Sequence, residues 1–227
     1  GRVIDPMNHT DAIADIWIEE GRIAAPRAKA PVSACRYDLA GRWVVPGLID
    51  MHVHLREPGQ EYKETIATGT MAAAAGGFTA VACMPNTRPV NDNAAVTRYI
   101  LDKAADCAAR VYPVGALSRD SQGQQLAEYG ELKDAGAVAL TDDGMPVVDS
   151  QLMRRAMEYA DSHGLPVISH AEESSLSRNG CMNEGAVSTR LGLRGIPTAA
   201  ESIMVYREIA LAELTGARVH IAHVSCE

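Results

Sequence analysis

Residues 43–54, WVVPGLIDMHVH, form an apolar run that ends in two histidines. Such a run predicts a strand over residues 43–53 that is buried in a parallel sheet. Side chains at i and i+2 of a strand share one face, so His52 and His54 are neighbours that can bind one ion. The pair ends its strand and opens onto a loop rich in Pro and Gly. This position favours a ligand pair over two polar side chains that are simply satisfied by neighbours.

The alternation of strand and helix repeats along the rest of the chain. Strands are predicted over residues 43–53, 78–84, 110–114, 137–140, 166–169 and 218–222. Helices are predicted near residues 62–76, 93–109, 124–134, 150–163 and 198–215. Six strands in βα alternation indicate an α/β fold with a parallel sheet and right-handed crossovers. The loop over residues 171–197 is long enough to predict a lid or binding loop.

The start of the chain has a different pattern of apolar residues. Short apolar stretches alternate with turn residues there, which predicts part of a small N-terminal β-domain over residues 1–42, ahead of an α/β domain over residues 43–227. The chain ends just after the sixth strand, whereas a TIM-like (β/α)8 barrel needs two more units. We therefore expect such a barrel, truncated after strand six, and a sequence that is part of a longer polypeptide.

The composition is that of a globular chain with excess negative charge. The 227 residues are 47% hydrophobic, which can bury a substantial core, and the formal net charge is -8. Nucleic-acid binding needs clustered Lys and Arg, whereas the 21 here are scattered, so no nucleic-acid partner is expected. No apolar run reaches the length of a membrane span and no signal segment opens the chain. We expect no membrane association and a cytoplasmic location.

The five cysteines do not predict a disulfide framework or a thiolate zinc site. Their number is odd and no CxxC pair occurs. Cys83 lies in an apolar strand and Cys107 in an alanine-rich helix, so both are predicted to be small core residues.

Three further side chains follow predicted strands in the manner of the first histidine pair. His170 and His223 close the fifth and sixth strands, and Asp143 follows the fourth. A single strand-end histidine is more often structural, and Asp142-Asp143-Gly144 alone could be a plain turn with a helix cap. Parallel strand ends converge on one site in an α/β barrel, however, and a carboxylate beside imidazoles can bridge two divalent ions. Together these residues predict a metal centre.

Several motifs together resemble the amidohydrolase superfamily and, within it, the longer-chain class I dihydroorotases. The matching stretches cover essentially the whole chain: Pro46 to Gly59, Ala82 to Thr87, Thr141 to Gly144, Ser169 to Glu172, Asn183 to Gly185 and His220 to Ser225. The opening Gly1 to Pro6 is similar to the N-terminal β-domain of that family.

The resemblance implies a zinc-dependent cyclic amide hydrolase of de novo pyrimidine biosynthesis. It would interconvert dihydroorotate and N-carbamoyl-L-aspartate by means of metal-activated hydroxide. The metal ligands for one or two Zn²⁺ ions would be His52, His54, Asp143, His170 and His223. Asp143 would bridge the metals because it directly precedes the glycine, and Asp142 is the fallback.

The resemblance also assigns residues to the substrate. Arg56, two residues beyond the histidine pair and expected on the same face, would bind the substrate carboxylate with its guanidinium. Asn86, at the end of the second strand, would add a second polar contact to that carboxylate. The general acid/base aspartate of the family follows the eighth strand and so lies beyond residue 227.

Two alternatives remain open. Many superfamily members bridge their metals with a carboxylated lysine after the fourth strand, and this sequence has no lysine there. Hydantoinases and allantoinases usually carry that lysine, which makes them the weaker enzymatic alternative. The second alternative is a catalytically silent homologue that serves as an assembly partner of aspartate transcarbamoylase. A homo-oligomer is expected in either case.

Overall fold

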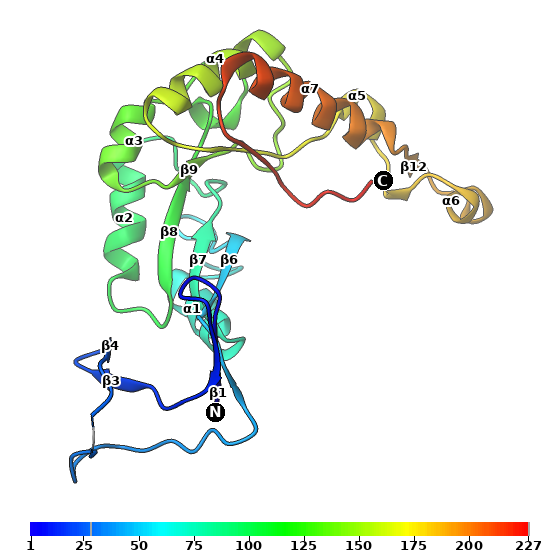
Figure 1. Ribbon diagram of the computed structural model, residues 1–227. Coiled ribbons are helices and arrows are strands. Elements are labelled where there is room, and N and C mark those ends of the chain that lie inside the picture. Colours follow the sequence, from blue (N-terminus) through cyan, green and yellow to red (C-terminus); the bar gives the residue numbers. More distant parts are fainter. Residues whose placement is uncertain (28, 227) are drawn as a thin grey trace. The chain divides into compact units, whose positions relative to one another are not determined.

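The computed structural model describes residues 1–27 and 29–226 (Figure 1). These residues divide into two compact units, Gly1–Leu48 and Ile49–Glu227. Within the described ranges, no helix has the length and apolar character that crossing a membrane requires.

The first unit consists of short strands. β1 (Arg2–Asp5) pairs antiparallel with β2 (Thr10–Ile13) and parallel with β5 (Trp43–Val44), and β3 (Trp17–Glu19) forms a hairpin with β4 (Arg22–Ala24). Every described side chain before Leu48 is at least partly exposed. The small β-domain expected over residues 1–42 stays a prediction.

The second unit is built on a six-stranded sheet that curls like half of a barrel. Its strand order is β13-β10-β9-β8-β7-β6, so that each strand lies beside the strand before it in this unit. The strands are β6 (Leu48–Val53), β7 (Phe78–Cys83), β8 (Arg110–Gly115), β9 (Ala139–Leu140), β10 (Val167–Ser169) and β13 (Val219–Ile221). The pairs from β7 to β13 are parallel, which confirms the α/β class.

Helices connect successive strands of this sheet. They are α1 (Ile66–Ala75), α2 (Ala94–Ala104), α3 (Tyr129–Ala135), α4 (Ser150–Ser162) and α7 (Ala199–Thr215). Figure 1 shows α2, α3, α4 and α7 along the outer side of the curled sheet. A short 3-10 turn, η1 (Arg119–Ser121), follows β8. The connection after β10 contains α5 (Ser174–Ser177), β11 (Met182–Asn183), α6 (Ala186–Leu191) and β12 (Gly195–Ile196).

Local signals explain where the helices begin. Thr65 accepts a hydrogen bond from the backbone N–H of Thr68 in a capping box, so α1 begins at Ile66, later than the sequence pattern predicts. The side chains of Asn93 and Asp149 accept hydrogen bonds from backbone N–H groups at the starts of α2 and α4, without the reciprocal bond of a capping box.

The run that opens the sequence forms two strands where one was predicted. β5 ends at Val44 and β6 begins at Leu48, and the two belong to different sheets. Pro46 lies between them, and its ring nitrogen cannot donate to a strand ladder. The result is that β6 begins at Leu48 and still carries His52 at its carboxyl end.

The largest buried cluster packs α3 and α4 against β9 and β10. Its members include Tyr129, Leu132, Leu140, Met157 and Val167, each fully buried. The Tyr129 ring stacks on that of Tyr159 with centroids 4.6 Å apart, and its hydroxyl donates to the carbonyl oxygen of Leu117 at 2.8 Å. This core fixes the strand end that precedes Asp143.

Cys83 is expected to resist alkylation in the folded protein. Its side chain is 3% exposed, and burial raises the pKa of its thiol to about 12. Because the thiolate is the reactive form, roughly one molecule in 10,000 would carry it near pH 8, against about one in four for an ordinary thiol. Iodoacetamide labelling followed by peptide mass spectrometry should find the exposed Cys35 and Cys181 modified first. Labelling of Cys83 at a similar rate would contradict its buried position.

Candidate metal centre

Five polar side chains from four strand ends meet at the carboxyl edge of the curled sheet. His52 is part of β6, and His54 follows that strand by one residue. Asp143 lies three residues after β9, His170 directly after β10, and His223 two residues after β13. The positions of these residues at predicted strand ends indicate that they converge, and the structure brings all five side chains together.

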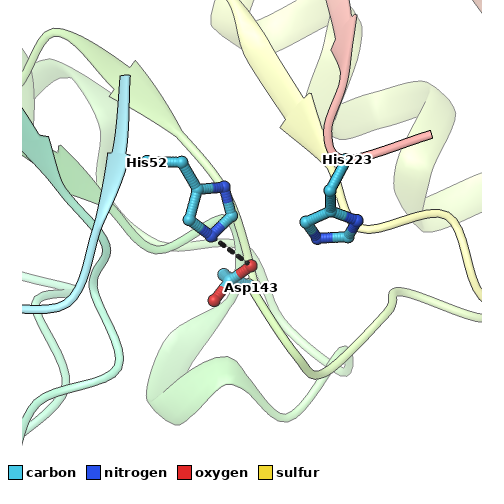
Figure 2. Close-up of side chains that lie close together, drawn as sticks. All are labelled: His52, Asp143 and His223. Carbon is cyan, nitrogen blue, oxygen red and sulfur yellow. Dashed lines mark ion pairs between the residues drawn. The ribbon is translucent and has the colours of Figure 1, made fainter. Parts of the chain in front are cut away.

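Asp143 lies among the imidazoles. Its Oδ1 is 3.2 Å from Nε2 of His52 (dashed line in Figure 2) and 3.8 Å from Nδ1 of His170. Its Oδ2 is 3.6 Å from Nε2 of His54. The Asp143 side chain is 7% exposed, so the carboxylate is almost withdrawn from solvent. A buried carboxylate with both oxygens toward histidines can bridge ions that these rings bind.

His223 completes the group on the side of β10 and β13. Its Nε2 lies 3.0 Å from Nδ1 of His170, and its ring centroid is 5.4 Å from that of His52. His52, Asp143 and His223 each offer one ligand atom, and these atoms all lie within 4.8 Å of one another. Figure 2 shows the two rings on either side of the carboxylate. Imidazole nitrogens with a carboxylate oxygen are a donor set that suits zinc, so the residues fit a divalent ion.

The charge state of His52 also suits a metal ligand. Burial lowers its pKa below the ordinary value, and the nearby His54 and His223 act in the same direction, although Asp143 opposes them. The ring is therefore neutral near pH 7, and a neutral imidazole is the form that donates a lone pair to a metal.

Asp142, the fallback ligand, is directed elsewhere. Its carboxylate accepts hydrogen bonds from the backbone N–H and the hydroxyl of Ser118. Burial raises the pKa of Asp142, while the bonds from Ser118 oppose that shift. Of the two neighbouring aspartates, Asp143 is the one that faces the histidines.

Asn86 lies inside the cluster and contacts two of its members. Its Oδ1 is 3.0 Å from Nδ1 of His54, and its Nδ2 donates to Oδ2 of Asp143 at 3.2 Å. A carbonyl oxygen can only accept, so Nδ1 of His54 is the donor in this contact and Nε2 is the ring nitrogen directed toward Asp143. The resemblance assigns Asn86 to the substrate, and the sequence does not predict these two contacts.

Glu172 is a site residue that was not predicted from the sequence. Its Oε2 lies 2.9 Å from Nε2 of His170, on the opposite side of the ring from Nδ1. Hydrogen bonds from Ser177 and from His170 lower the pKa of Glu172. Metal-binding histidines commonly donate their second N–H to a carboxylate. The spacing of His170 and Glu172 in the sequence was a usable signal, since a carboxylate two residues from a strand-end histidine can reach its ring.

Arg56 lies in the loop after β6. The strand ends at Val53 and Arg56 has a φ of 62°, so the strand alternation expected to carry its side chain to the face of the histidines stops before it. The side chain is half-buried. Its assignment to a substrate carboxylate stays a prediction.

A parallel α/β sheet whose strand ends gather imidazoles and a carboxylate is typical of metal-dependent hydrolases with barrel folds. Comparison with known proteins narrows this class. The dihydro-orotase-like family matches residues 41–227. The chain belongs to this dihydro-orotase-like family.

Curated relatives agree with this assignment, and a solved structure shares the fold. A dihydroorotase of Desulfotalea psychrophila is 73% identical over 226 residues, which are 100% of this chain and 54% of that protein. A dihydroorotase of Syntrophobacter fumaroxidans is 62% identical over 231 residues, with 99% and 53% covered. The L-hydantoinase (dihydropyrimidinase) of Arthrobacter aurescens superposes with a TM-score of 0.77 at 21% identity, over 99% of this chain and 51% of its own. This last likeness shows the fold. The chain spans about half the length of the curated relatives it matches.

Proposed function

We propose that the protein interconverts dihydroorotate and N-carbamoyl-L-aspartate, the dihydroorotase reaction of pyrimidine biosynthesis. The observation that carries the proposal is the 73% identity to a dihydroorotase across the whole of this chain. The donor cluster at the carboxyl edge of the sheet supports it independently, because hydrolysis of a cyclic amide needs a polarised carbonyl and an activated water. We further propose that the six strands are the first part of a TIM-like eight-stranded barrel.

The proposed metal ligands are the five clustered residues, His52, His54, Asp143, His170 and His223, which would hold one or two Zn²⁺ ions. A bound zinc ion polarises a carbonyl oxygen and makes water more acidic. The protein's own contribution is to hold the ligand side chains in a fixed orientation. Asn86 holds His54 with Nε2 turned toward Asp143, and Glu172 holds His170 with Nδ1 turned toward His223.

Arg56 is proposed to recognise the substrate. Both dihydroorotate and N-carbamoyl-L-aspartate carry a carboxylate, which a guanidinium can bind with two parallel hydrogen bonds. Asn86 is proposed as the second contact to that carboxylate, through the amide that contacts Asp143 in this structure. A ring that lacks the carboxylate, such as hydantoin, would gain nothing from Arg56.

The test is a spectrophotometric assay of the zinc-loaded full-length protein with dihydroorotate, hydantoin and allantoin. Turnover of dihydroorotate well above the other two is expected. Turnover of hydantoin without turnover of dihydroorotate would overturn the substrate assignment. Failure of the protein to take up zinc, together with no turnover, would instead favour a silent assembly partner of aspartate transcarbamoylase.

Replacement of Arg56 by Gln is expected to raise KM for dihydroorotate by roughly 10-fold to 100-fold, because a charge-assisted bidentate contact to the substrate is lost. Zinc content should not change. Arg98→Gln, at an exposed position on α2, is the matched control and should leave KM unaltered. Equal kinetics in Arg56→Gln and wild type would remove Arg56 from the substrate site.

Replacement of Glu172 by Gln is expected to weaken zinc binding by about 10-fold to 100-fold, the usual cost of losing a hydrogen-bond partner behind a metal-binding histidine. The carboxylate accepts from Nε2 of His170, and an amide accepts more weakly. Competition with a chromogenic chelator measures the affinity. Glu131→Gln on α3 is the control, since that side chain is in the first turn of a helix away from the cluster. Unchanged affinity in Glu172→Gln would show that the contact does not orient His170.

A further inference from the structure

Helix α7 contacts the segments next to three of the proposed ligands. Two of its glutamates make the contacts near His170 and His223. Glu201 and Glu208 are seven residues apart, which is close to two turns, so both lie on the same face of the helix. Arg207, beside Glu208, donates from Nη1 to the carbonyl oxygen of Val148 at 3.0 Å. Val148 lies between Asp143 and α4, so the helix also contacts the segment that follows Asp143.

Glu201 holds the backbone that follows His223. Its carboxylate accepts from the backbone N–H of Ser225 at 3.0 Å, from the Ser225 hydroxyl at 3.0 Å and from the backbone N–H of Cys226 at 2.6 Å. His223 has a φ of 34°, in a region that residues other than glycine seldom occupy. A strained residue needs its neighbours fixed, and the bonds to Glu201 supply that restraint two and three residues further on.

Glu208 holds the residue that precedes His170. Its carboxylate, 0% exposed, accepts from the hydroxyl of Ser169 at 3.3 Å and is paired with the Arg207 guanidinium. Among the described residues, Oε2 of Glu208 and Nε of Arg207 have no hydrogen-bond partner. Both residues line a small cavity that also borders His170 and Asp142. The pair by itself is weak evidence for stability, because well-packed apolar side chains often stabilise as well as a buried ion pair does.

We propose that Glu201 and Glu208 are positioning residues of the metal centre. From one rigid helix they fix the chain on either side of the pair formed by His170 and His223, and so they keep Nδ1 of His170 within 3.0 Å of Nε2 of His223. This inference rests on the proposed role of those two histidines as ligands. The positions of His170 and His223 are thus determined by α7 and not by the strands alone.

The test uses two variants of the full-length protein, Glu208→Gln and Glu201→Gln. Glu201 is half-buried, so its replacement should disturb the fold less than that of the buried Glu208. Each variant should bind zinc about 10-fold more weakly or worse, in line with other residues that orient metal ligands. Each should lower kcat for dihydroorotate while KM stays within about 2-fold, because Arg56, the proposed substrate contact, follows β6 and not β10 or β13. The visible absorption spectrum of the cobalt-substituted protein should change in both variants. A purely structural role would not alter that spectrum.

Glu213→Gln, at an exposed position near the end of the same helix, is the matched control and should behave as wild type. Glutamine variants with wild-type zinc affinity and cobalt spectrum would overturn the inference while leaving the proposed function in place. A wild-type protein that binds no zinc would overturn both.

Discussion

Replacement of Asp143 by Asn is expected to lower both zinc affinity and dihydroorotase activity of the full-length protein by more than about 100-fold. Loss of a residue that only orients a ligand costs about 10-fold to 100-fold, so loss of a direct ligand should cost more. The carboxylate places Oδ1 near His52 and His170 and Oδ2 near His54, and the amide keeps the shape but removes the charge. Zinc content by mass spectrometry and steady-state kinetics measure the two effects.

Asp142→Asn is the discriminating control, because the two aspartates are adjacent in the sequence. Asp142 contacts Ser118, and burial raises its pKa, so a neutral amide is tolerated there and zinc content should stay at the wild-type level. Zinc loss in Asp142→Asn together with zinc retention in Asp143→Asn would show that the fallback is the ligand.

Replacement of Leu140 by Ala is expected to cost about 2–5 kcal/mol of unfolding free energy, the range for deletion of a fully buried leucine side chain. Leu140 is 0% exposed and ends β9, three residues before Asp143. The same change should lower the melting temperature of the full-length protein by several degrees. Thermal and urea denaturation followed by circular dichroism measure both quantities.

Leu214→Ala provides the comparison on the surface. That side chain is 62% exposed on α7, so its truncation should change the unfolding free energy by no more than about 0.5 kcal/mol. Equal losses in the two variants would mean that Leu140 is not part of a tightly packed core.

The order of strands and helices could be predicted because each βα unit has its own sequence period. Five of the predicted helices correspond to α1, α2, α3, α4 and α7, and the six strands correspond to β6, β7, β8, β9, β10 and β13. The separation of β5 from β6 was not predicted, because the apolar character continues through Val45 and Pro46. Hydrophobicity alone does not reveal where a backbone changes sheets, although the proline was a usable sign.

The convergence of the five predicted ligand side chains follows from one rule, that parallel strand ends share an edge. Their role as ligands stays a prediction. The contacts that orient these side chains could not be predicted from the sequence. Such contacts depend on loop conformation and on packing between distant elements. Ser169 and Glu208, for example, are 39 residues apart and meet only after α7 packs against the sheet.

The most direct test of the metal centre is an anomalous difference map, recorded at the zinc absorption edge, from crystals of the zinc-loaded full-length protein. We expect a peak for one or two ions among the imidazoles of His52, His54, His170 and His223, in contact with the carboxylate of Asp143. A zinc peak bound elsewhere, or none at these five side chains at full zinc loading, would contradict this expectation.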